Sequence, residues 1–327
     1  MGKLLYSIII PHKNLPNLLQ RCLDSIPQRD DMEVIIVDDS SDPGIVDFNN
    51  FPGSNREDVT VVFDKSCMGA GRARNIGLGH AKGRWILFAD ADDFFNYCLN
   101  DILNDYKDDD SDIIYFPSSS LDSDTYINTQ RGEQHVSRIN NYLEGGPNSE
   151  KMLRYALPSP WGKIIRKSLI TDHDIFFQET RINNDVKFNY MVGYYARTIK
   201  ADKRAAYCVT YRSTSITYSL TEGKILDKMR VSAEEELFYL AHHIDLPPYF
   251  FHTYIRTIID FNVEKQKDLY DKCLNVLMEY GISPQQVKSM IASEKRRRII
   301  AKVRSRLAVR SRIRKLSAFW GTHKHGN

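Results

Sequence analysis

Four short apolar runs in the first hundred residues constrain the fold most, because none of them alternates with polar residues. They are YSIII at 6–10, EVIIV at 33–37, VTVVF at 59–63 and RWILFA at 84–89. Apolar residues at helical spacing lie between the runs, as in Asn17–Ile26 and after Gly69. Uninterrupted apolar strands separated by helices are typical of a parallel sheet covered on both faces. The sequence therefore predicts an α/β fold with a mostly parallel sheet and helices on both faces, and we expect Pro11 to end the first strand.

The rest of the chain differs in character from this first part. One more strand is expected at 113–116, whereas 118–147 is rich in Ser, Asp and Asn and is interpreted as an insertion or lid with little regular structure. Helical spacing returns from Leu226 onward, at 229–243, 249–263, 267–280 and 284–291. We therefore predict three parts: an α/β domain over 1–220, a helical C-terminal region over 221–293 and a basic amphipathic tail over 294–327.

Charge is distributed unevenly along the chain. The tail from Glu294 to Asn327 has 12 Lys and Arg residues and one acid, whereas the preceding part has 33 bases and 41 acids. Ile299 and Ile300 stand among the bases, so that 295–320 would form an amphipathic helix on an anionic membrane surface. A nucleic-acid site and a solvated tail are the alternatives. The sequence favours membrane attachment, and no nucleic-acid partner is expected.

Simple counts exclude several classes of protein. No run reaches the roughly 18 apolar residues of a spanning helix, and the apolar stretch at the N-terminus is too short for a signal peptide. The five cysteines are far apart and include no CxxC pair, which argues against a disulfide framework and a structural zinc site. We therefore expect a cytoplasmic protein.

Acidic residues follow two of the predicted strands. Asp38 and Asp39 come directly after the second run, and Asp90, Asp92 and Asp93 follow the fourth. Ligands of open α/β sheets bind outside the carboxyl ends of the strands, so we expect these carboxylates to converge there. Such hard oxygen ligands suit Mg²⁺ or Mn²⁺, and an acid after a strand also accepts hydrogen bonds from a nucleotide. The alternative is structural, because Asp also favours turns and helix caps.

Two further segments offer chemistry. The turn from Gly69 to Gly77 follows a strand and opens a helix, but it lacks the G-x-G-x-x-G spacing of dinucleotide sites. Arg72 and Arg74 near a helix N-terminus would suit a diphosphate, and an exposed Gly-rich connector is the alternative. Asp185 stands before an apolar helical run, where it is either an N-cap or a general base toward an alcohol.

Six motifs in fixed order resemble the inverting glycosyltransferases of family 2, which have the Rossmann-like GT-A fold. They are SIIIPHKN (7–14), EVIIVDDSSD (33–42), GAGRARNIGL (69–78), RWILFADADD (84–93), WGKIIRKSLI (161–170) and FQETRINNDVKF (177–188). The resemblance covers about residues 5–217 and includes Arg212 and Ser215, in a segment whose role is not implied.

The resemblance implies a set of nucleotide-sugar-binding residues. Pro11 and Asp39 would contact the nucleotide base, and Asp38 would shape their loop or contact the nucleoside. Arg74 would lie beside the base and the diphosphate. Trp161 would lie near the sugar and the acceptor, with a packed tryptophan as an equal alternative.

The resemblance divides the remaining acids into a metal pair and a catalytic base. Asp90 and Asp92 match the family's DxD pair, with Asp92 the expected ligand of Mn²⁺ or Mg²⁺ and Asp90 nearer the ribose. Asp185 matches the catalytic base that deprotonates the acceptor. Asn184 departs from the pattern, because a glutamate often precedes that aspartate.

These roles together imply an enzyme and a place of action. It would move a hexose or N-acetylhexosamine from a nucleotide sugar, by preference UDP-linked, to a hydroxyl of a glycan or lipid-linked acceptor in surface polysaccharide synthesis. With the basic tail, this implies a peripheral protein on the inner face of the plasma membrane. Two other classes stay open: a non-catalytic nucleotide-sugar-binding protein, indicated by Asn184, and a nucleic-acid-binding protein acting through the tail.

Overall fold

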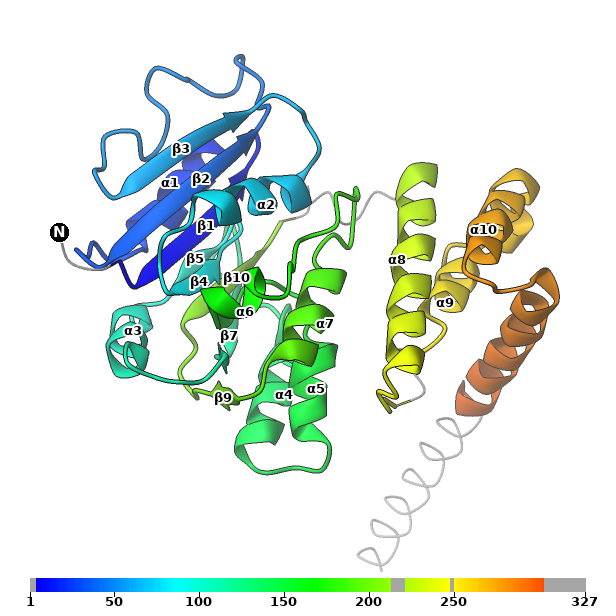
Figure 1. Ribbon diagram of the computed structural model, residues 1–327. Helices are drawn as coiled ribbons and strands as arrows, with labels where there is room; N and C mark the ends of the chain where they lie inside the picture. The colour runs from blue at the N-terminus through cyan, green and yellow to red at the C-terminus, as the bar shows by residue number, and fades with distance from the viewer. Residues whose placement is uncertain (1–3, 213–220, 248–249, 303–327) are drawn as a thin grey trace, which may run out of the picture. The chain divides into compact units, whose positions relative to one another are not determined.

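The computed structural model describes residues 4–212, 221–247 and 250–302 (Figure 1). The chain divides into two compact units: the first runs to Asp227 and includes His243–Leu246, and the second contains Lys228–His242 and the chain from Pro247. Within the described ranges, no helix is both long enough and apolar enough to cross a membrane.

A seven-stranded sheet forms the centre of the first unit. In spatial order its strands are β3 (Val59–Asp64), β2 (Met32–Asp39), β1 (Tyr6–His12), β4 (Trp85–Phe88), β8 (Lys163–Arg166), β6 (Ile113–Tyr115) and β9 (Ile199–Ala201). β8 runs antiparallel to both neighbours, and the other pairs are parallel. The mostly parallel sheet predicted from the apolar runs is therefore confirmed.

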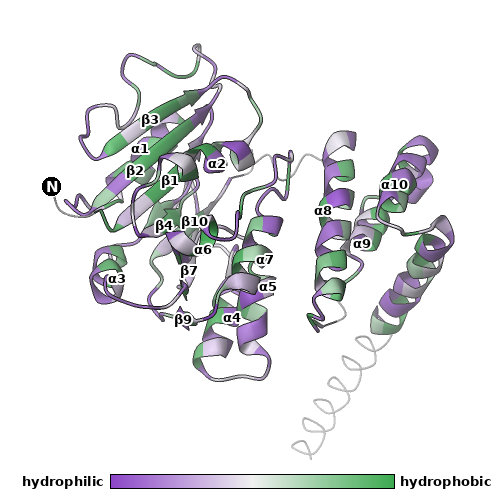
Figure 2. Ribbon diagram, viewed as in Figure 1, coloured by the Kyte–Doolittle hydropathy of each residue, from purple (hydrophilic) through white to green (hydrophobic). Residues whose placement is uncertain are grey.

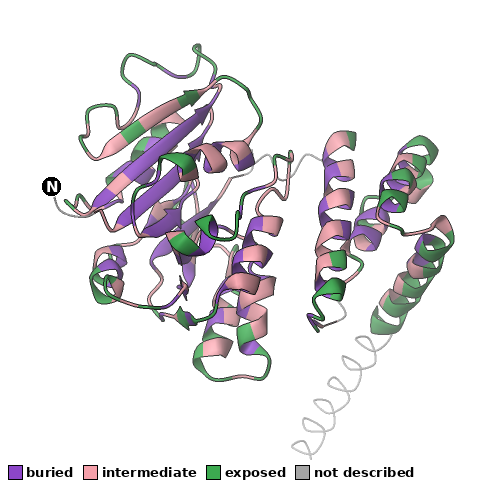
Figure 3. Cartoon of the chain, in the orientation of Figure 1, coloured by how far each residue is buried: buried purple, intermediate pink, exposed green. Residues whose placement is uncertain are grey.

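Helices cover both faces of this sheet, as predicted. They are α1 (Pro16–Asp24), α2 (Ala70–His80), α3 (Leu99–Tyr106), α4 (Glu133–Leu143), α5 (Ser149–Ala156), α6 (Lys167–Thr171) and α7 (Val186–Tyr195). Alternate residues of β1 point to opposite faces, so that Ile8 packs in the cluster with α1 and α3, and Ile9 packs in the cluster with α2 and α7. Figures 2 and 3 show β1 and β2 as largely hydrophobic and buried strands.

A small second sheet lies beside the first within the same unit. Its strands are, in order, β5 (Phe94–Phe95), β10 (Tyr207–Tyr211) and β7 (Ser118–Asp122). β10 is antiparallel to β5 and parallel to β7. Residues 90–93, which we call the acidic segment, lie between β4 and β5. The small sheet therefore joins the acidic segment to a part of the chain more than a hundred residues away.

Two expectations about local structure were wrong. β1 does not end before Pro11 but continues to His12, pairing Pro11 with Val37 and His12 with Asp38 of β2. Its pairing with β4 has ended at Ile9, so the missing N–H of Pro11 lies where β1 has a single neighbouring strand.

The second correction concerns 118–147, which has regular structure instead of being an irregular insertion or lid. It contains β7 and α4, which are joined by a loop over 123–132. The serines of β7 pair through their main chain with β10, and α4 buries only His135 and Ile139. Because so few apolar side chains are needed, hydrophobic periodicity did not reveal either element.

The chain after residue 221 is helical, as expected. Its elements are α8 (Glu222–Ala241), α9 (Thr253–Asp260), the 3₁₀ turn η3 (Val263–Lys265), α10 (Lys267–Glu279) and a helix over 284–302. This last helix extends beyond the predicted 284–291 and includes the first bases of the tail. The part of the tail after residue 302, and Ser215, lie outside the described residues.

Candidate active site

Three of the five carboxylates that were expected to converge lie together directly after β4. Oxygen atoms of Asp90, Asp92 and Asp93 all lie within 4.8 Å of one another. Asp93 is buried, whereas Asp90 and Asp92 are partly exposed. Hard oxygen ligands at this spacing fit a divalent cation such as Mg²⁺ or Mn²⁺ that keeps several waters.

Asp93 differs from the other two because it supports the structure of the site. Its carboxylate accepts hydrogen bonds from the hydroxyl of Tyr207 at 2.8 Å and from the main-chain N–H of Thr210 at 2.7 Å. Burial raises the pKa of Asp93 well above its usual value, and the carboxylates of Asp92 and Asp90 raise it further. Asp93 therefore fixes β10 against the acidic segment, which leaves Asp90 and Asp92 as the pair exposed to a ligand.

Arginines pair with both of these exposed acids. Arg74 of α2 donates from Nη2 to Asp90 Oδ1 at 2.6 Å. Arg212 donates to Asp92 Oδ2 from Nε at 3.0 Å and from Nη2 at 2.7 Å. The sequence placed Arg74 in the site, but it gave no sign that Arg212 pairs with Asp92.

Arg74 also connects the acids to the segment before α7. Its Nη1 donates to Asn184 Oδ1 at 2.9 Å, and its guanidinium lies over the ring of Phe177, 5.3 Å from the centroid. The Nε atom is buried and has no hydrogen-bond partner among the described residues. The position of α2 requires glycine at Gly71, where a Cβ would lie 2.1 Å from the carbonyl oxygen of Gln178.

Asp185 lies at the N-terminus of α7, where nearby charged side chains shift the pKa of its carboxyl group. It occupies the N-cap position, but its carboxylate makes no capping hydrogen bond. Burial raises its pKa, the charges of Arg74 and Lys163 lower it, and that of Asp90 raises it, with a net increase. Its carboxylate is therefore not used as a helix cap, and a raised pKa suits a general base.

The end of β2 forms a rigid corner around Asp38. Asp38 accepts hydrogen bonds from His12 Nδ1 at 2.7 Å and from the N–H and hydroxyl of Ser41 at 2.9 and 2.5 Å. Since His12 Nε2 accepts the N–H of Leu15, the proton of this imidazole lies on Nδ1. Burial alone would raise the pKa of Asp38, but the bonds from His12 and Ser41 outweigh it and hold the pKa below its usual value.

Asp39 points to the turn that opens α2. It accepts hydrogen bonds from the N–H of Gly69 at 3.1 Å and from Lys13 Nζ at 3.3 Å. Lys13 also donates to the exposed thiol of Cys67 at 2.7 Å. Asp39 therefore ties the end of β2 to the loops after β1 and β3, and Pro11 is buried at the same end of the sheet.

Several loops at this edge hold strained residues. Asn14, Ser40, Cys67 and Asn183 have positive φ values of 56°, 57°, 54° and 56°. Residues other than glycine seldom adopt a positive φ. Those that do often lie at functional sites, where surrounding contacts hold them. Here the main-chain N–H of Asn14 donates to Ser41, and the hydroxyl of Ser40 donates to Asp64. These two hydrogen bonds hold the loops after β1 and β2 in place.

Trp161 and Lys163 are fixed by packing around β8. The ring of Trp161 is half-buried and stacks on Tyr207 with centroids 5.3 Å apart and an 11° angle between the planes. Lys163 is buried and donates to the carbonyl oxygens of Leu157 and Ser159 and to Asn189. Burial lowers the pKa of Lys163 to about 7. Trp161 and Lys163 therefore both have structural partners.

Several supporting residues were not predicted from the sequence. Tyr207 donates to Asp93 and also accepts the main-chain N–H of Asp90 at 2.9 Å, and Thr210 donates to the carbonyl oxygen of Asp92 at 2.7 Å. The run from Tyr207 is apolar enough to predict a strand, but the sequence does not indicate which acidic residues that strand contacts.

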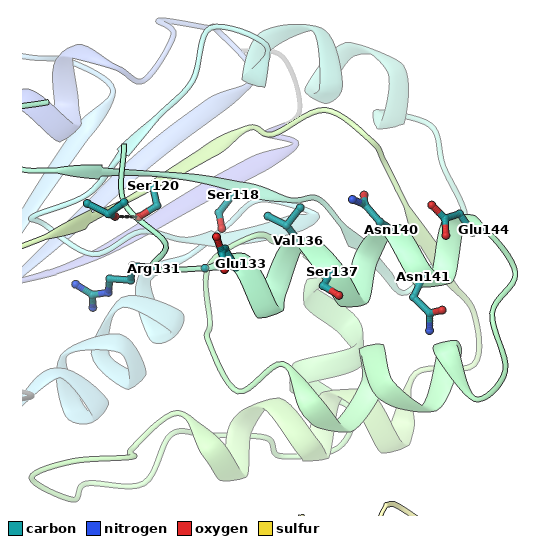
Figure 4. Close-up of a pocket in the computed structure, with 11 residues that line it drawn as sticks. Ser118, Ser120, Arg131, Glu133, Val136, Ser137, Asn140, Asn141 and Glu144 are labelled. Carbon is teal, nitrogen blue, oxygen red and sulfur yellow. Dashed lines mark hydrogen bonds between the residues drawn. The ribbon is translucent and has the colours of Figure 1, made fainter. Parts of the chain in front are cut away.

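A polar groove opens between β7 and α4 (Figure 4). It has a volume of about 570 Å³ and is lined by hydroxyl, amide and charged side chains, among them Ser120, Arg131, Ser137, Asn140 and Glu144. Arg131 donates to the carbonyl oxygen of Thr210, the residue whose hydroxyl bonds to Asp92. The groove is thus linked to Asp92 through Thr210 of β10.

The structure resembles solved structures of one bacterial protein. S. aureus TarS, as the fragment 1–349 in complex with UDP-GlcNAc, matches with a TM-score of 0.60 over 88% of this chain and 84% of that chain, at 22% identity. A second crystal structure of the same TarS fragment gives the same TM-score at 20% identity. This likeness identifies the fold as GT-A, and the chain also has a helical C-terminal region.

The sequence also matches known families and relatives. The profile described as Glycosyl transferase family 2 matches residues 7–174, and the chain belongs to this family. A poly(ribitol-phosphate) beta-glucosyltransferase from Bacillus spizizenii is 38% identical over 93 residues, which are 27% of this chain and 15% of that protein. A PGL/p-HBAD biosynthesis glycosyltransferase from Mycobacterium bovis is 35% identical over 95 residues, 28% of this chain and 37% of that protein. The matched segments thus span well under half the length of these curated relatives.

Proposed function

We propose that the protein is an inverting glycosyltransferase that moves a hexose or N-acetylhexosamine from a nucleotide sugar to a hydroxyl of a surface glycan. The observation that carries this proposal is the junction made by Arg74, which contacts Asp90 on one side and Asn184, next to Asp185, on the other. In support, these contacts hold Arg74, the proposed diphosphate ligand, near the proposed base in a family 2 chain. We assign this catalytic domain to 1–220, with 221–293 as a helical region.

The donor is proposed to be a UDP-sugar, held at the carboxyl edge of β1 and β2. Pro11 and Asp39 would contact the base, with Asp38 fixing their loop through His12. In support, the structurally similar TarS is described in complex with UDP and with UDP-GlcNAc. Arg74, together with the N-terminal turn of α2, would face the diphosphate.

The residues at the site suggest a single displacement. Asp185 takes the proton of the acceptor hydroxyl while the oxygen of that hydroxyl forms a bond to the anomeric carbon. The bond from the anomeric carbon to the diphosphate breaks at the same time. The nucleoside diphosphate leaves on the opposite face, so the anomeric configuration is inverted. A Mn²⁺ or Mg²⁺ ion held by Asp92 and Asp90 would supply charge stabilisation for the leaving diphosphate.

The acceptor is proposed to be a glycan or a lipid-linked glycan of a surface polymer. The polar groove between β7 and α4 supports this class, because hydroxyl and amide side chains suit a hydroxyl-rich chain and its volume is in the range of ligand sites. The name of one relative, poly(ribitol-phosphate) beta-glucosyltransferase, supports a polymer as acceptor. Trp161 would lie near the transferred sugar.

A donor screen tests the function. Purified protein with Mn²⁺ or Mg²⁺ is given a panel of nucleotide sugars, and the released nucleoside diphosphate is measured, with Asp92→Ala as the metal-site variant. We expect release from one donor, loss of that release with EDTA, and loss in Asp92→Ala. Absence of metal-dependent nucleotide binding as well as of release would contradict the proposed site.

A second variant separates the enzyme from the non-catalytic alternative. Asp185→Asn removes the proposed base with little change in volume, so we expect transfer to fall by roughly 10²–10⁴-fold while nucleotide binding stays at the wild-type level. If the wild-type protein binds the donor tightly but gives no turnover with any acceptor mixture, the chain is a nucleotide-sugar-binding protein.

A further inference from the structure

Both members of the proposed metal pair are already neutralised by cationic side chains. Arg74 takes one oxygen of Asp90, and Arg212 places two N–H donors on the same oxygen of Asp92, Oδ2. The ion pair between Arg212 and Asp92 is partly shielded from water, with side chains 18% and 21% exposed. Such shielding makes the attraction stronger than in a fully solvated surface pair.

The main chain of Asp92, from which this carboxylate extends, is held in place by two hydrogen bonds. Its carbonyl oxygen accepts hydrogen bonds from Arg21 Nη2 at 2.6 Å and from the hydroxyl of Thr210 at 2.7 Å. A divalent cation on this carboxylate would therefore meet a guanidinium that already holds Oδ2. The two positive groups repel each other at this distance, so each weakens the binding of the other.

We propose that Arg212 acts as a counterion that holds the metal position in the absence of donor, and that the cation enters together with the nucleotide diphosphate. This inference rests on the proposed function and adds an order of binding to it. A guanidinium pairs with phosphate oxygens as well as with carboxylates. The diphosphate thus offers Arg212 a new partner and supplies the negative charge that the cation needs, so metal and nucleotide favour each other's binding.

The test measures Mn²⁺ alone, without substrate turnover. Binding to the full chain is followed by electron paramagnetic resonance of free Mn²⁺, first without and then with UDP. We expect Arg212→Gln to bind Mn²⁺ roughly tenfold more tightly than wild type without UDP, as a coupling of ordinary size would give. With UDP present, we expect this gain to disappear, because wild-type Arg212 then pairs with phosphate.

Three further variants make the result specific. Arg212→Lys keeps the charge and should keep the weak binding of wild type. Arg21→Gln removes an arginine that touches the main chain of Asp92 but not its carboxylate, so its gain should be much smaller. Asp92→Asn combined with Arg212→Gln should abolish the gain. Thermal unfolding of each variant shows whether it is folded.

The outcomes separate this inference from the proposed function. Equal Mn²⁺ affinity of wild type and Arg212→Gln without UDP overturns the counterion role, even if Mn²⁺ and UDP bind together and sugar is transferred. A gain that persists unchanged with UDP overturns the proposed order of binding. Absence of Mn²⁺ binding to every variant, with UDP included, overturns both the counterion role and the metal-dependent function.

Discussion

Asp38 and Asp185 lie at the same edge of the sheet, yet their surroundings shift their pKa values in opposite directions. Burial raises the pKa of both carboxyls. For Asp38, direct hydrogen bonds from His12 and Ser41 outweigh burial, whereas for Asp185 the more distant charges of Arg74 and Lys163 do not. Asp38 is therefore kept as an anion that organises a loop, and Asp185 is left with a greater affinity for a proton.

This difference predicts the pH dependence of Arg74 variants. The proposed base must be deprotonated, so kcat should fall at low pH through a limb above the usual 3.8 of an aspartate. Arg74→Gln removes the charge that most lowers the pKa of Asp185, and we expect the acid limb to move to higher pH. Arg74→Lys, which keeps the charge, is the control, and pH profiles of kcat at saturating donor are the measurement. An unchanged limb in Arg74→Gln would exclude Asp185 as the titrating group.

A second residue-scale prediction concerns stability. Burial, followed by the charges of Lys163 and Arg138, lowers the pKa of His135 from 6.5 to about 3. The unfolded chain then binds a proton that the folded chain does not, so stability is full above pH 6.5 and falls as the pH drops toward 3. We expect His135→Gln to reduce the slope of the unfolding free energy between pH 6.5 and 5 by up to about 1.4 kcal/mol per pH unit. Chemical denaturation at several pH values measures this slope, and identical slopes would show that His135 titrates normally.

At the scale of elements, the fit of α2 against the segment 177–185 determines where Arg74 lies. Gly71 leaves no room for a side chain, since a Cβ would lie 2.1 Å from the carbonyl oxygen of Gln178 and 3.0 Å from Asn184. The contact is with main chain, which cannot move aside as a flexible side chain would. The first turn of α2 and the start of α7 therefore have to be placed together.

Two glycines of the same helix give a matched test. Gly71→Ala should destabilise the fold by roughly 1–3 kcal/mol, as overpacking does, and should weaken nucleotide binding. Gly79→Ala has no atom within 4 Å of its added Cβ and should stabilise α2 by up to about 1 kcal/mol. Thermal or denaturant unfolding of both variants measures these changes in stability. Equal stability of the two would mean that the segment 177–185 does not press on α2.

The predictability of the elements follows from how each one is stabilised. β1, β2 and β4 are buried on both faces, so their apolar runs and the acids that follow them could be recognised directly. β7 and α4 depend on main-chain pairing and two buried side chains, and neither leaves a periodic pattern. The pairing of Arg212 with Asp92 joins residues 120 positions apart. No local pattern encodes such a contact, which is why the candidate acids were predicted but their partners were not.

At the scale of the whole molecule, the described part of the tail bears on the proposed membrane attachment. In the helix over 284–302, Ile299 is 63% exposed and Ile300 is 45% exposed. Arg296 and Lys302 belong to the same helix and are exposed, so apolar and basic side chains lie on it together. This combination favours an anionic lipid interface as the partner of 295–320.

Vesicle binding tests this attachment with the full chain. We expect cosedimentation with vesicles of phosphatidylglycerol and phosphatidylcholine, weaker at high salt, and little with phosphatidylcholine alone. Replacing Ile299 and Ile300 with serine should weaken binding by roughly tenfold, because apolar burial is lost while the charges remain. Tighter, salt-sensitive binding to RNA than to these vesicles would instead favour the nucleic-acid alternative.

The support of Asp93 by Thr210 has a consequence for biosynthesis of the chain. These two residues are 117 positions apart, and β10 lies near the end of the first unit. Domains emerge from the ribosome N-terminal part first, and contacts of long sequence separation form late. A nascent chain that ends before β10 can pair β1, β2 and β4 but lacks the strand that closes the acidic segment. The proposed donor site is thus complete only when translation has passed β10, so we expect shorter nascent chains not to bind nucleotide sugars.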